Sequence, residues 1–443
     1  MNIYIINNPF HYEIENLTRA FFNNEKMNVI KCDKNVNREK PFVAIELIKH
    51  EKDSDIIVSF ADEDFEKTLS KKIDGEFDSE YSECERMAAI MLFEILSEYT
   101  SIRLPWGILT GVRPIKLLHN LVRELGTDGA DKYFREKLLV TEQKTKLALT
   151  TEKNERKILE LSKPDSFSLY ISVPFCPTRC SYCSFVSQSI EKAKKLVEPY
   201  LDLLCQEIKY TAEIAKELNL RLETVYIGGG TPTTFSAEQL TKLITAINAS
   251  FDMKKCREFT IEAGRPDTIT REKLEAILDG GCDRISINPQ TLNDEVLEAI
   301  GRRHTATQTL EAYKLAEEIG FKHINMDLIT GLPKDTPETF KYTLDTLCDL
   351  SPASITVHTL AMKRSSFLTL GGTLVKTGAE PPAAIMMKYC EEKLPQFGYH
   401  PYYLYRQSRM EGNLENVGWS KDGFDGTVGR FHRLLLLCVY AYI

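Results

Sequence analysis

Three cysteines stand close together near the middle of the chain, at Cys176, Cys180 and Cys183, with the spacing C-x3-C-x2-C. They directly follow an apolar, strand-like segment, FSLYISV at 167–173. Three thiolates in one short loop can ligate three irons of a [4Fe-4S] cube and leave the fourth iron open. An open iron can bind a small molecule, which a site with four cysteines cannot. The spacing therefore predicts an iron–sulfur site that also binds a ligand.

Two other interpretations of these cysteines remain. A structural zinc site usually combines a C-x2-C pair with a second pair of ligands, and no second pair lies nearby in the sequence. A chance cluster of thiols is the other alternative. The preceding strand and the aromatic Tyr182 directly before Cys183 favour the iron–sulfur interpretation.

The glycine-rich segment YIGGGTPT at 226–233 is the second candidate for chemistry. Glycines without a Cβ let a ligand approach the backbone, and free N–H groups there can bind a carboxylate. A tight turn with no ligand explains the same run equally well.

A regular alternation of strand and helix patterns begins at Phe167. These strands and helices must position both the cysteine loop and the glycine-rich segment. The expected strands are 167–173, 224–229, 258–263, 283–288, 322–328 and 354–359, and the expected helices between them are 191–218, 236–249, 271–279, 293–300, 306–319 and 337–349. This alternation predicts a parallel sheet, and right-handed crossovers curl such a sheet into a partial or complete barrel. Ligands should bind where the strands end.

Polar residues follow several of these strands. Glu262 ends the third strand, Gln290 follows the fourth, Arg302 follows the next helix, and Asp327 closes the fifth strand. Each alone is explained as a solvated or hydrogen-bonded side chain. Together they are expected to ring the functional rim of one barrel.

The remaining parts flank the barrel. Residues 1–164 are expected to form a small α+β module, with a hairpin that joins strands at 42–49 and 55–60 and with helices from about residue 83. Residues 165–380 are the expected core barrel and 381–443 a C-terminal segment. The terminal apolar run, within GRFHRLLLLCVYAYI, is too short to span a bilayer. It is either a core strand or a sign that the natural C-terminus is lost.

The composition is that of an ordinary soluble protein. Of 443 residues, 43% are hydrophobic and 27% charged, which excludes a disordered or collagen-like chain. The formal net charge of −8 provides no global basic field for nucleic acid. Neither a transmembrane run nor a secretory signal is visible. The cysteines outside the 176–183 segment are scattered singly, which is typical of reduced thiols. We expect a cytoplasmic protein with no nucleic-acid partner and no membrane span.

Taken together, residues 165–405 resemble the radical S-adenosylmethionine (SAM) superfamily, whose signature is C-x3-C-x-aromatic-C after the first barrel strand. The fold this implies is α/β, a radical SAM partial (β/α)6 barrel preceded by the small α+β module. In that family SAM chelates the open iron of a [4Fe-4S] cluster, and one electron cleaves it to methionine and a 5′-deoxyadenosyl radical. The cofactor supplies the difficult chemistry, and the barrel orients the reacting groups and excludes water from the site.

A narrower resemblance is to the oxygen-independent coproporphyrinogen III dehydrogenase (oxidase) family, and within it to the HemZ-type members. It is carried by YISVPFCPTRCSYCSF, YIGGGTPT, TIEAGRPD, RISINPQTLNDEVLEAIGRRHT and MDLITGLPKDTPETF. It implies that Cys176, Cys180 and Cys183 hold the cluster and that Tyr170, Gly229 and Glu262 contact the cluster-bound SAM. The positions it implies around a second SAM are Tyr182, Gly230, Thr231, Gln290, Arg302, Asp327 and Ala361.

The reaction implied is oxidative decarboxylation of two propionates of coproporphyrinogen III to vinyls, which gives protoporphyrinogen IX in haem biosynthesis. The partners implied are this tetrapyrrole and a reduced electron donor protein. No catalytic residue is expected beyond the cluster and SAM. Four substrate carboxylates need cations, and the candidates by charge are Arg265, Arg302, Arg303, Arg364 and Arg406.

The sequence departs from the family pattern in three places. Ser172 stands where the oxidases often have His, and Phe185 where they often have a fourth Cys. The chain also diverges after about residue 423, which predicts a truncation or a shifted reading frame. Two alternatives to the dehydrogenase stay open: a haem-binding chaperone on the same fold, with His304 or His358 as candidate axial ligands, and a radical SAM enzyme with another substrate.

Overall fold

The computed structural model describes residues 1–22, 25–33, 36–77, 80–185, 187–361, 380–407, 410–426 and 435–439. The chain divides into two compact units, which we describe separately. The first contains Met1–Leu149 and also Tyr405–Glu415, and the second begins at Thr150 and includes Ile385–Leu404. The three-part division at residues 164 and 380 stays a prediction.

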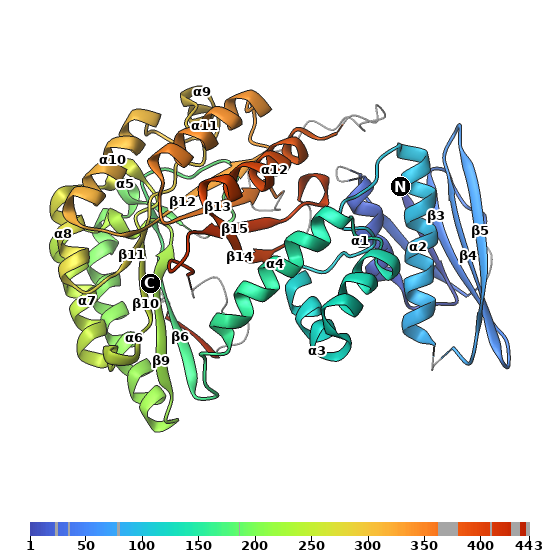
Figure 1. Cartoon of the computed structure of the whole chain (residues 1–443), viewed down its shortest axis with the longest axis horizontal. Coiled ribbons are helices and arrows are strands. Elements are labelled where there is room, and N and C mark those ends of the chain that lie inside the picture. Colours follow the sequence, from blue (N-terminus) through green and yellow to red (C-terminus); the bar gives the residue numbers. More distant parts are fainter. Residues whose placement is uncertain are drawn as a thin grey trace. The chain divides into compact units, whose positions relative to one another are not determined.

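The first unit contains a five-stranded sheet with the order β2-β1-β3-β4-β5. Its elements are β1 (Asn2–Ile6), α1 (His11–Phe21), β2 (Asn28–Cys32), β3 (Phe42–Lys49), β4 (Asp53–Ala61), β5 (Glu66–Asp74), α2 (Tyr81–Thr100), α3 (Pro114–Lys132), a π-helical turn (Tyr133–Lys137) and the start of α4 (Glu142–Leu159). Strands β3 and β4 pair antiparallel from Phe42↔Ala61 onward, which confirms the predicted hairpin. Helix α2 packs on this sheet, with the ring centroids of its Tyr99 and of Phe60 on β4 4.7 Å apart (Figure 1).

A buried polar cluster attaches the Tyr405–Glu415 segment to the rest of the first unit. The indole nitrogen of Trp106 donates to Glu415 Oε2 at 2.6 Å. The Lys144 ammonium forms an ion pair with Glu415 Oε1, and both side chains are almost completely buried. The Arg406 guanidinium donates to the backbone carbonyls of Leu109 and Asn413. Because a buried charge needs partners, these contacts make the late segment part of this unit's core.

The second unit is built on a nine-stranded sheet with the order β14-β15-β13-β12-β11-β10-β9-β6-β16. From residue 166 on, the elements are β6 (Ser166–Val173), β7 (Phe175–Cys176), β8 (Gln188–Ser189), α5 (Ile190–Ala193), α6 (Val197–Glu217), β9 (Arg221–Gly229), α7 (Ala237–Ser250), β10 (Glu258–Glu262), α8 (Arg271–Asp279), β11 (Arg284–Ser286), α9 (Asp294–Ala299), α10 (Ala306–Ile319), β12 (His323–Thr330), α11 (Pro337–Leu350), β13 (Ser354–Thr359), α12 (Pro382–Lys393), β14 (His400–Tyr405), β15 (Asn416–Ser420) and β16 (Leu435–Val439).

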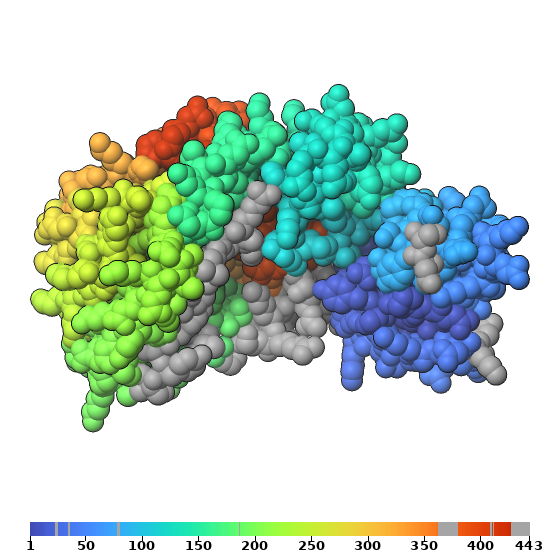
Figure 2. All heavy atoms as spheres, turned by 90° about the horizontal axis from the view of Figure 1, so that it is seen from below, coloured from blue at the N-terminus to red at the C-terminus, as the bar shows by residue number. Residues whose placement is uncertain are grey.

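Strands β6, β9, β10, β11, β12 and β13 are neighbours in chain order and pair in parallel, so the predicted parallel α/β sheet is confirmed. The sheet is curled, with α6, α7, α8 and α10 on one side of it (Figure 1). In the space-filling view α6 and α7, green to yellow-green, form part of this unit's outer surface (Figure 2). Helices α7, α10 and α11 each begin with a capping box, which satisfies their first backbone N–H groups.

Three strands extend the sheet beyond the six predicted ones. Strand β15 pairs antiparallel with β13, from Ser354↔Ser420 to Val357↔Val417. Strand β14 follows as the outermost strand on that side. Strand β16, part of the terminal apolar run, pairs in parallel with β6 on the opposite side. Among the helices of the described residues, none is both long enough and apolar enough to cross a membrane.

Candidate active site

The cysteine loop begins on the short strand β7, which follows β6 directly. Cys180 is buried, and Cys176 and Cys183 are partly exposed. Two contacts fasten this loop to the segment after α9: the Thr178 hydroxyl donates to Gly301 O at 2.8 Å, and Ser181 N donates to Ile300 O at 3.0 Å. The loop therefore has a defined position above the end of β6.

The chemistry of the three thiols fits an iron–sulfur cluster. Burial raises the pKa of Cys176 and of Cys183, and the nearby Cys180 thiol raises both further. The three groups are thus close enough to affect one another's ionisation. Within the described ranges, no group of three or more His, Cys, Asp or Glu side chains is arranged so that it could hold a single metal ion. A cube cluster takes each of three thiolates on a different iron, whereas a closed zinc site takes four ligands, and this loop offers three thiols.

The glycine segment packs against the cysteine strand. Gly230 N donates to Val173 O and Thr231 N to Phe175 O, each at 2.7 Å. A Cβ on Gly230 would lie 2.6 Å from Phe175 O and 3.0 Å from Cys176 Sγ. The expectation that these N–H groups are free to bind a carboxylate is therefore wrong for Gly230 and Thr231. Their observed role is to place the backbone directly behind Cys176.

Tyr170, Tyr226 and Glu262 form a connected set on three neighbouring strands, β6, β9 and β10. The rings of Tyr170 and Tyr226 stack with centroids 5.9 Å apart. The Tyr226 hydroxyl donates to Glu262 Oε1. Burial raises the pKa of Glu262 to about 7, and the Asp327 carboxylate contributes to the rise. Tyr226 was not among the site residues predicted from the sequence. Its register opposite Tyr170 in the parallel ladder is the signal that identifies it.

Asp327, on β12, continues this polar face. Its carboxylate accepts from Asn325 Nδ2 at 2.7 Å and lies 3.7 Å from His358 Nε2. Burial alone would raise the pKa of Asp327, but the contacts with His358, Asn325 and Thr356 lower it below its usual value. His358 also acts on the Glu262 carboxyl. The face therefore carries an ionised Asp327 near a Glu262 that holds its proton in mildly acidic solution.

Arg302 contacts Tyr182 of the cysteine loop, and Gln290 lies beside β12. Arg302 donates to the Tyr182 hydroxyl at 3.2 Å and to the backbone carbonyls of Gly264 and Asn288. Gln290 has a left-handed backbone (φ 66°), and its N–H donates to Asp327 O. Tyr182 packs on a buried apolar cluster formed by Val296, Leu297, Ile300, Ile329, Leu332 and Leu360. Ala361 directly follows Leu360 and is partly buried.

The structure argues against two of the five arginines that were candidates for binding a substrate carboxylate, Arg265 and Arg406. Arg265 and Arg406 are each only 3% exposed and are engaged by other groups. Arg302 is occupied by Tyr182 and two carbonyls. Arg303 is exposed and pairs with Glu191, and Arg364 lies outside the described residues. Charge alone could not distinguish these arginines, because it shows neither their burial nor partners such as Tyr182 for Arg302 and Glu191 for Arg303, which are far away in the chain.

Comparison with known proteins agrees with this geometry. A model of the radical SAM superfamily matches residues 170–347. The oxygen-independent coproporphyrinogen-III oxidase-like protein HemZ of Bacillus subtilis is 39% identical over 349 residues, which are 77% of this chain and 69% of that protein. The chain belongs to the HemZ-type branch of the radical SAM superfamily. A [4Fe-4S] cluster and SAM are therefore its cofactors.

Other relatives of this HemZ-type chain differ in function. The heme chaperone HemW of B. subtilis is 34% identical over 58% of this chain and 68% of that protein. The oxygen-independent coproporphyrinogen III oxidase of Escherichia coli is 32% identical over 44% of this chain and 42% of the enzyme. A solved structure of E. coli coproporphyrinogen III oxidase (HemN) matches with a TM-score of 0.50 and 23% identity, over 64% of this chain and 66% of that one. That last likeness concerns the fold.

Proposed function

We propose that the chain is an oxygen-independent coproporphyrinogen III dehydrogenase that converts two propionate side chains to vinyl groups and forms protoporphyrinogen IX. The observation that carries this proposal is the 39% identity with HemZ, an oxidase-like protein by its name, across 77% of the chain. The polar face along the ends of β6, β9, β10, β12 and β13 supports it, because ligands of parallel barrels bind there.

The residues proposed to hold the cofactors are those that the family motifs indicate. Cys176, Cys180 and Cys183 are proposed as the cluster ligands, and Tyr170, Gly229 and Glu262 as contacts of the cluster-bound SAM. The proposed surroundings of a second SAM are Tyr182, Gly230, Thr231, Gln290, Arg302, Asp327 and Ala361. The bound cluster and SAM supply a carbon-centred radical, which the protein must direct and shield.

The side chains of this site have three tasks in the proposed reaction. Tyr226 orients the Glu262 carboxyl through its hydroxyl hydrogen bond. Asp327 stays ionised beside His358, so the rim holds a carboxylate and an imidazole at one place. The apolar cluster beneath Tyr182 excludes water from that side. For each propionate, one hydrogen atom is removed, the bond to the carboxyl carbon breaks, CO2 leaves and one electron passes to an acceptor.

A product assay tests the proposal. Protein reconstituted without oxygen is given SAM, a reductant and coproporphyrinogen III, and mass spectrometry follows the loss of two carboxyl groups. Cys176→Ala should lose cluster and product, whereas Cys205→Ala, a thiol on α6 away from the loop, should keep both. SAM cleavage by the native chain without any vinyl product would reject the dehydrogenase.

Haem binding is the second candidate function, because the similar HemW is named a heme chaperone. His358 is the better placed axial ligand: its side chain is 28% exposed at the rim, whereas the side chain of His304 is fully buried. A titration with haem, followed by the absorption band, separates this function from the first. His358→Ala should lose the band if His358 is the ligand, while His50→Ala, on the first unit, should keep it. Absence of any band in the native chain would reject haem binding.

A further inference from the structure

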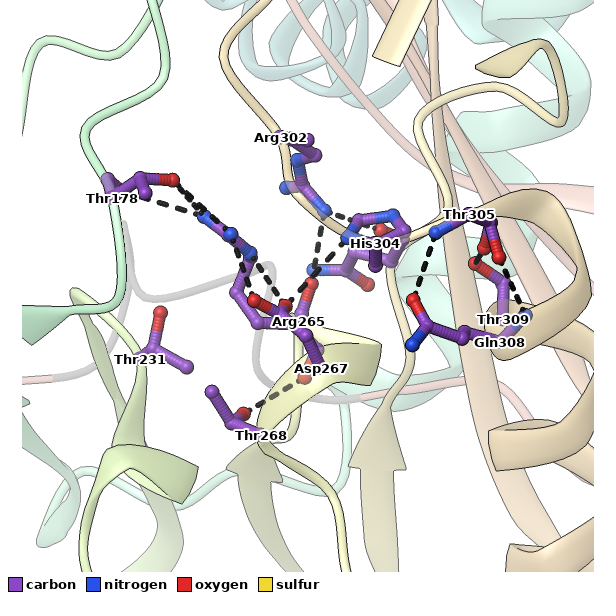
Figure 3. A network of polar contacts seen from close by, with 12 residues as sticks. Thr178, Thr231, Arg265, Asp267, Thr268, Arg302, His304, Thr305, Gln308 and Thr309 are labelled. Atoms are coloured by element: carbon purple, nitrogen blue, oxygen red, sulfur yellow. Dashed lines mark hydrogen bonds and ion pairs between the residues drawn. The ribbon is translucent and has the colours of Figure 1, made fainter. Parts of the chain in front are cut away.

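Arg265 stands beside the cysteine loop as a buried charge that no substrate can reach. It follows β10 by three residues and is 3% exposed. Figure 3 shows its guanidinium between Thr178 of the cysteine loop and Asp267. A guanidinium removed from water is expensive unless its donors are used, so the position of Arg265 requires an explanation.

The two edges of the guanidinium have different partners. Nε and Nη2 donate to the two carboxylate oxygens of Asp267, each at 3.1 Å, which is the bidentate geometry that arginine favours. Nη1 donates to Thr178 Oγ1 at 3.1 Å and lies 3.9 Å from Cys180 Sγ. Asp267 thus holds the arginine from one edge and leaves Nη1 directed at the cysteine loop.

The side of Asp267 away from Arg265 faces a histidine. His304 lies there, with Nδ1 3.7 Å from Asp267 Oδ1, and its side chain is fully buried. Burial lowers the pKa of His304, so the imidazole is neutral near pH 7. From Cys180 outward, the successive groups are therefore the Cys180 sulfur, the Arg265 guanidinium, the Asp267 carboxylate and the neutral His304 imidazole. Its positive end is the one that faces the sulfur.

We propose that Arg265 is a positioning residue for the iron–sulfur cluster, which anchors the loop at Thr178 and raises the cluster's reduction potential through its charge beside Cys180. Hydrogen bonds to cluster sulfurs and local net charge set such potentials. Reduction adds one electron, forms or breaks no bond in the protein, and makes the cluster more negative. A fixed cation next to one thiolate therefore favours the reduced state.

The test is a redox titration of the full chain, reconstituted without oxygen and followed by electron paramagnetic resonance, with iron and sulfide content measured in parallel. In Arg265→Gln the equilibrium constant for reduction of the cluster should fall at least tenfold. For a one-electron couple this is a shift of the reduction potential by 59 mV toward lower values. Asp267→Asn should shift the potential in the opposite direction, because it leaves the guanidinium uncompensated. Arg271→Gln is the matched control, since it removes an arginine from the exposed surface of α8.

The signs of the two shifts decide the outcome. Unchanged potentials in Arg265→Gln and Asp267→Asn at full iron content, or shifts of the same sign, would overturn the proposal. If Arg265→Gln does not retain its iron, Arg265→Lys should retain it with a potential near the native one, and Asp267→Asn then decides alone. This experiment contains no tetrapyrrole, so its failure is distinct from a failure of the proposed dehydrogenase activity.

Discussion

The carboxyl group of Glu262 should make the stability of the protein depend on pH. Burial raises its pKa from an ordinary 4.5 to about 7. Between these values the folded chain keeps a proton on Glu262 that the unfolded chain has lost. The contribution of Glu262 to stability is therefore largest below about pH 4.5, falls as the pH rises through the window, and is lost above about pH 7. At about 1.4 kcal/mol for each pH unit, the total loss is about 3 kcal/mol.

Glu262→Gln removes this dependence, because an amide does not ionise and its oxygen can still accept from the Tyr226 hydroxyl. The variant should gain about 3 kcal/mol relative to the native chain between pH 5 and pH 8. Urea unfolding of chelator-treated, reduced protein at the two pH values measures the gain. A matched control is Glu275→Gln, since that glutamate is 51% exposed on α8. A difference between native chain and Glu262→Gln that is the same at both pH values would refute the reasoning.

Two further regions give stability predictions. Gly230→Ala should destabilise the fold by about 1–3 kcal/mol and lower the iron content, because its Cβ would lie 2.6 Å from Phe175 O. Lys144→Met should cost about 3–5 kcal/mol, because it leaves the buried Glu415 carboxylate without its ammonium partner. Trp106→Phe should cost about 1–3 kcal/mol, because it removes the indole donor to the same carboxylate. Urea unfolding measures all three.

Gly230→Ala and Lys144→Met each have a control variant in the first unit. Gly111→Ala should be nearly neutral, because no atom lies within 4 Å of its Cβ position. Lys132→Met should cost less than about 1 kcal/mol, since its pair with Glu136 is exposed. Equal stability of Gly230→Ala and Gly111→Ala would remove the steric argument. A cost for Lys144→Met no larger than that for Lys132→Met would contradict the burial argument.

The fold could be predicted where the signal was local. Alternation of apolar residues placed the strand at 354–359 at the observed bounds of β13. Strand β5 was missed because its residues, EKTLSKKID, are mostly exposed and charged. Strands β14 and β15 were missed as sheet members because their pairing depends on partners far away in the chain, such as Ser354 for β15, whereas β16 lies in the terminal run for which a core strand was one of two interpretations. Local patterns carry no information about such partners.

The candidate site, like the fold, could be predicted where the signal was local and could not where it depends on distant parts of the chain. The spacing of the cysteines, a local feature, was sufficient to predict a cluster loop. A single tyrosine inside a strand, such as Tyr226, looks like a core residue until the register sets it beside Tyr170. Arg265 was noticed for its charge and wrongly considered for substrate. Its contacts with Thr178 and Cys180 join β10 to a loop formed much earlier in the chain, and only the folded structure shows them.

The return of the chain to its first unit has a consequence for fragment design. Because Tyr405–Glu415 belongs with Met1–Leu149, the first unit cannot be excised as one continuous piece. A fragment that stops at Leu149 would remove Glu415 from Trp106 and Lys144 and leave a hollow where the segment packed. A barrel fragment cut at the same point would separate Arg406 from the Leu109 carbonyl that accepts from its guanidinium. Separating the two units would therefore require several cuts in the backbone instead of one cut in a single linker.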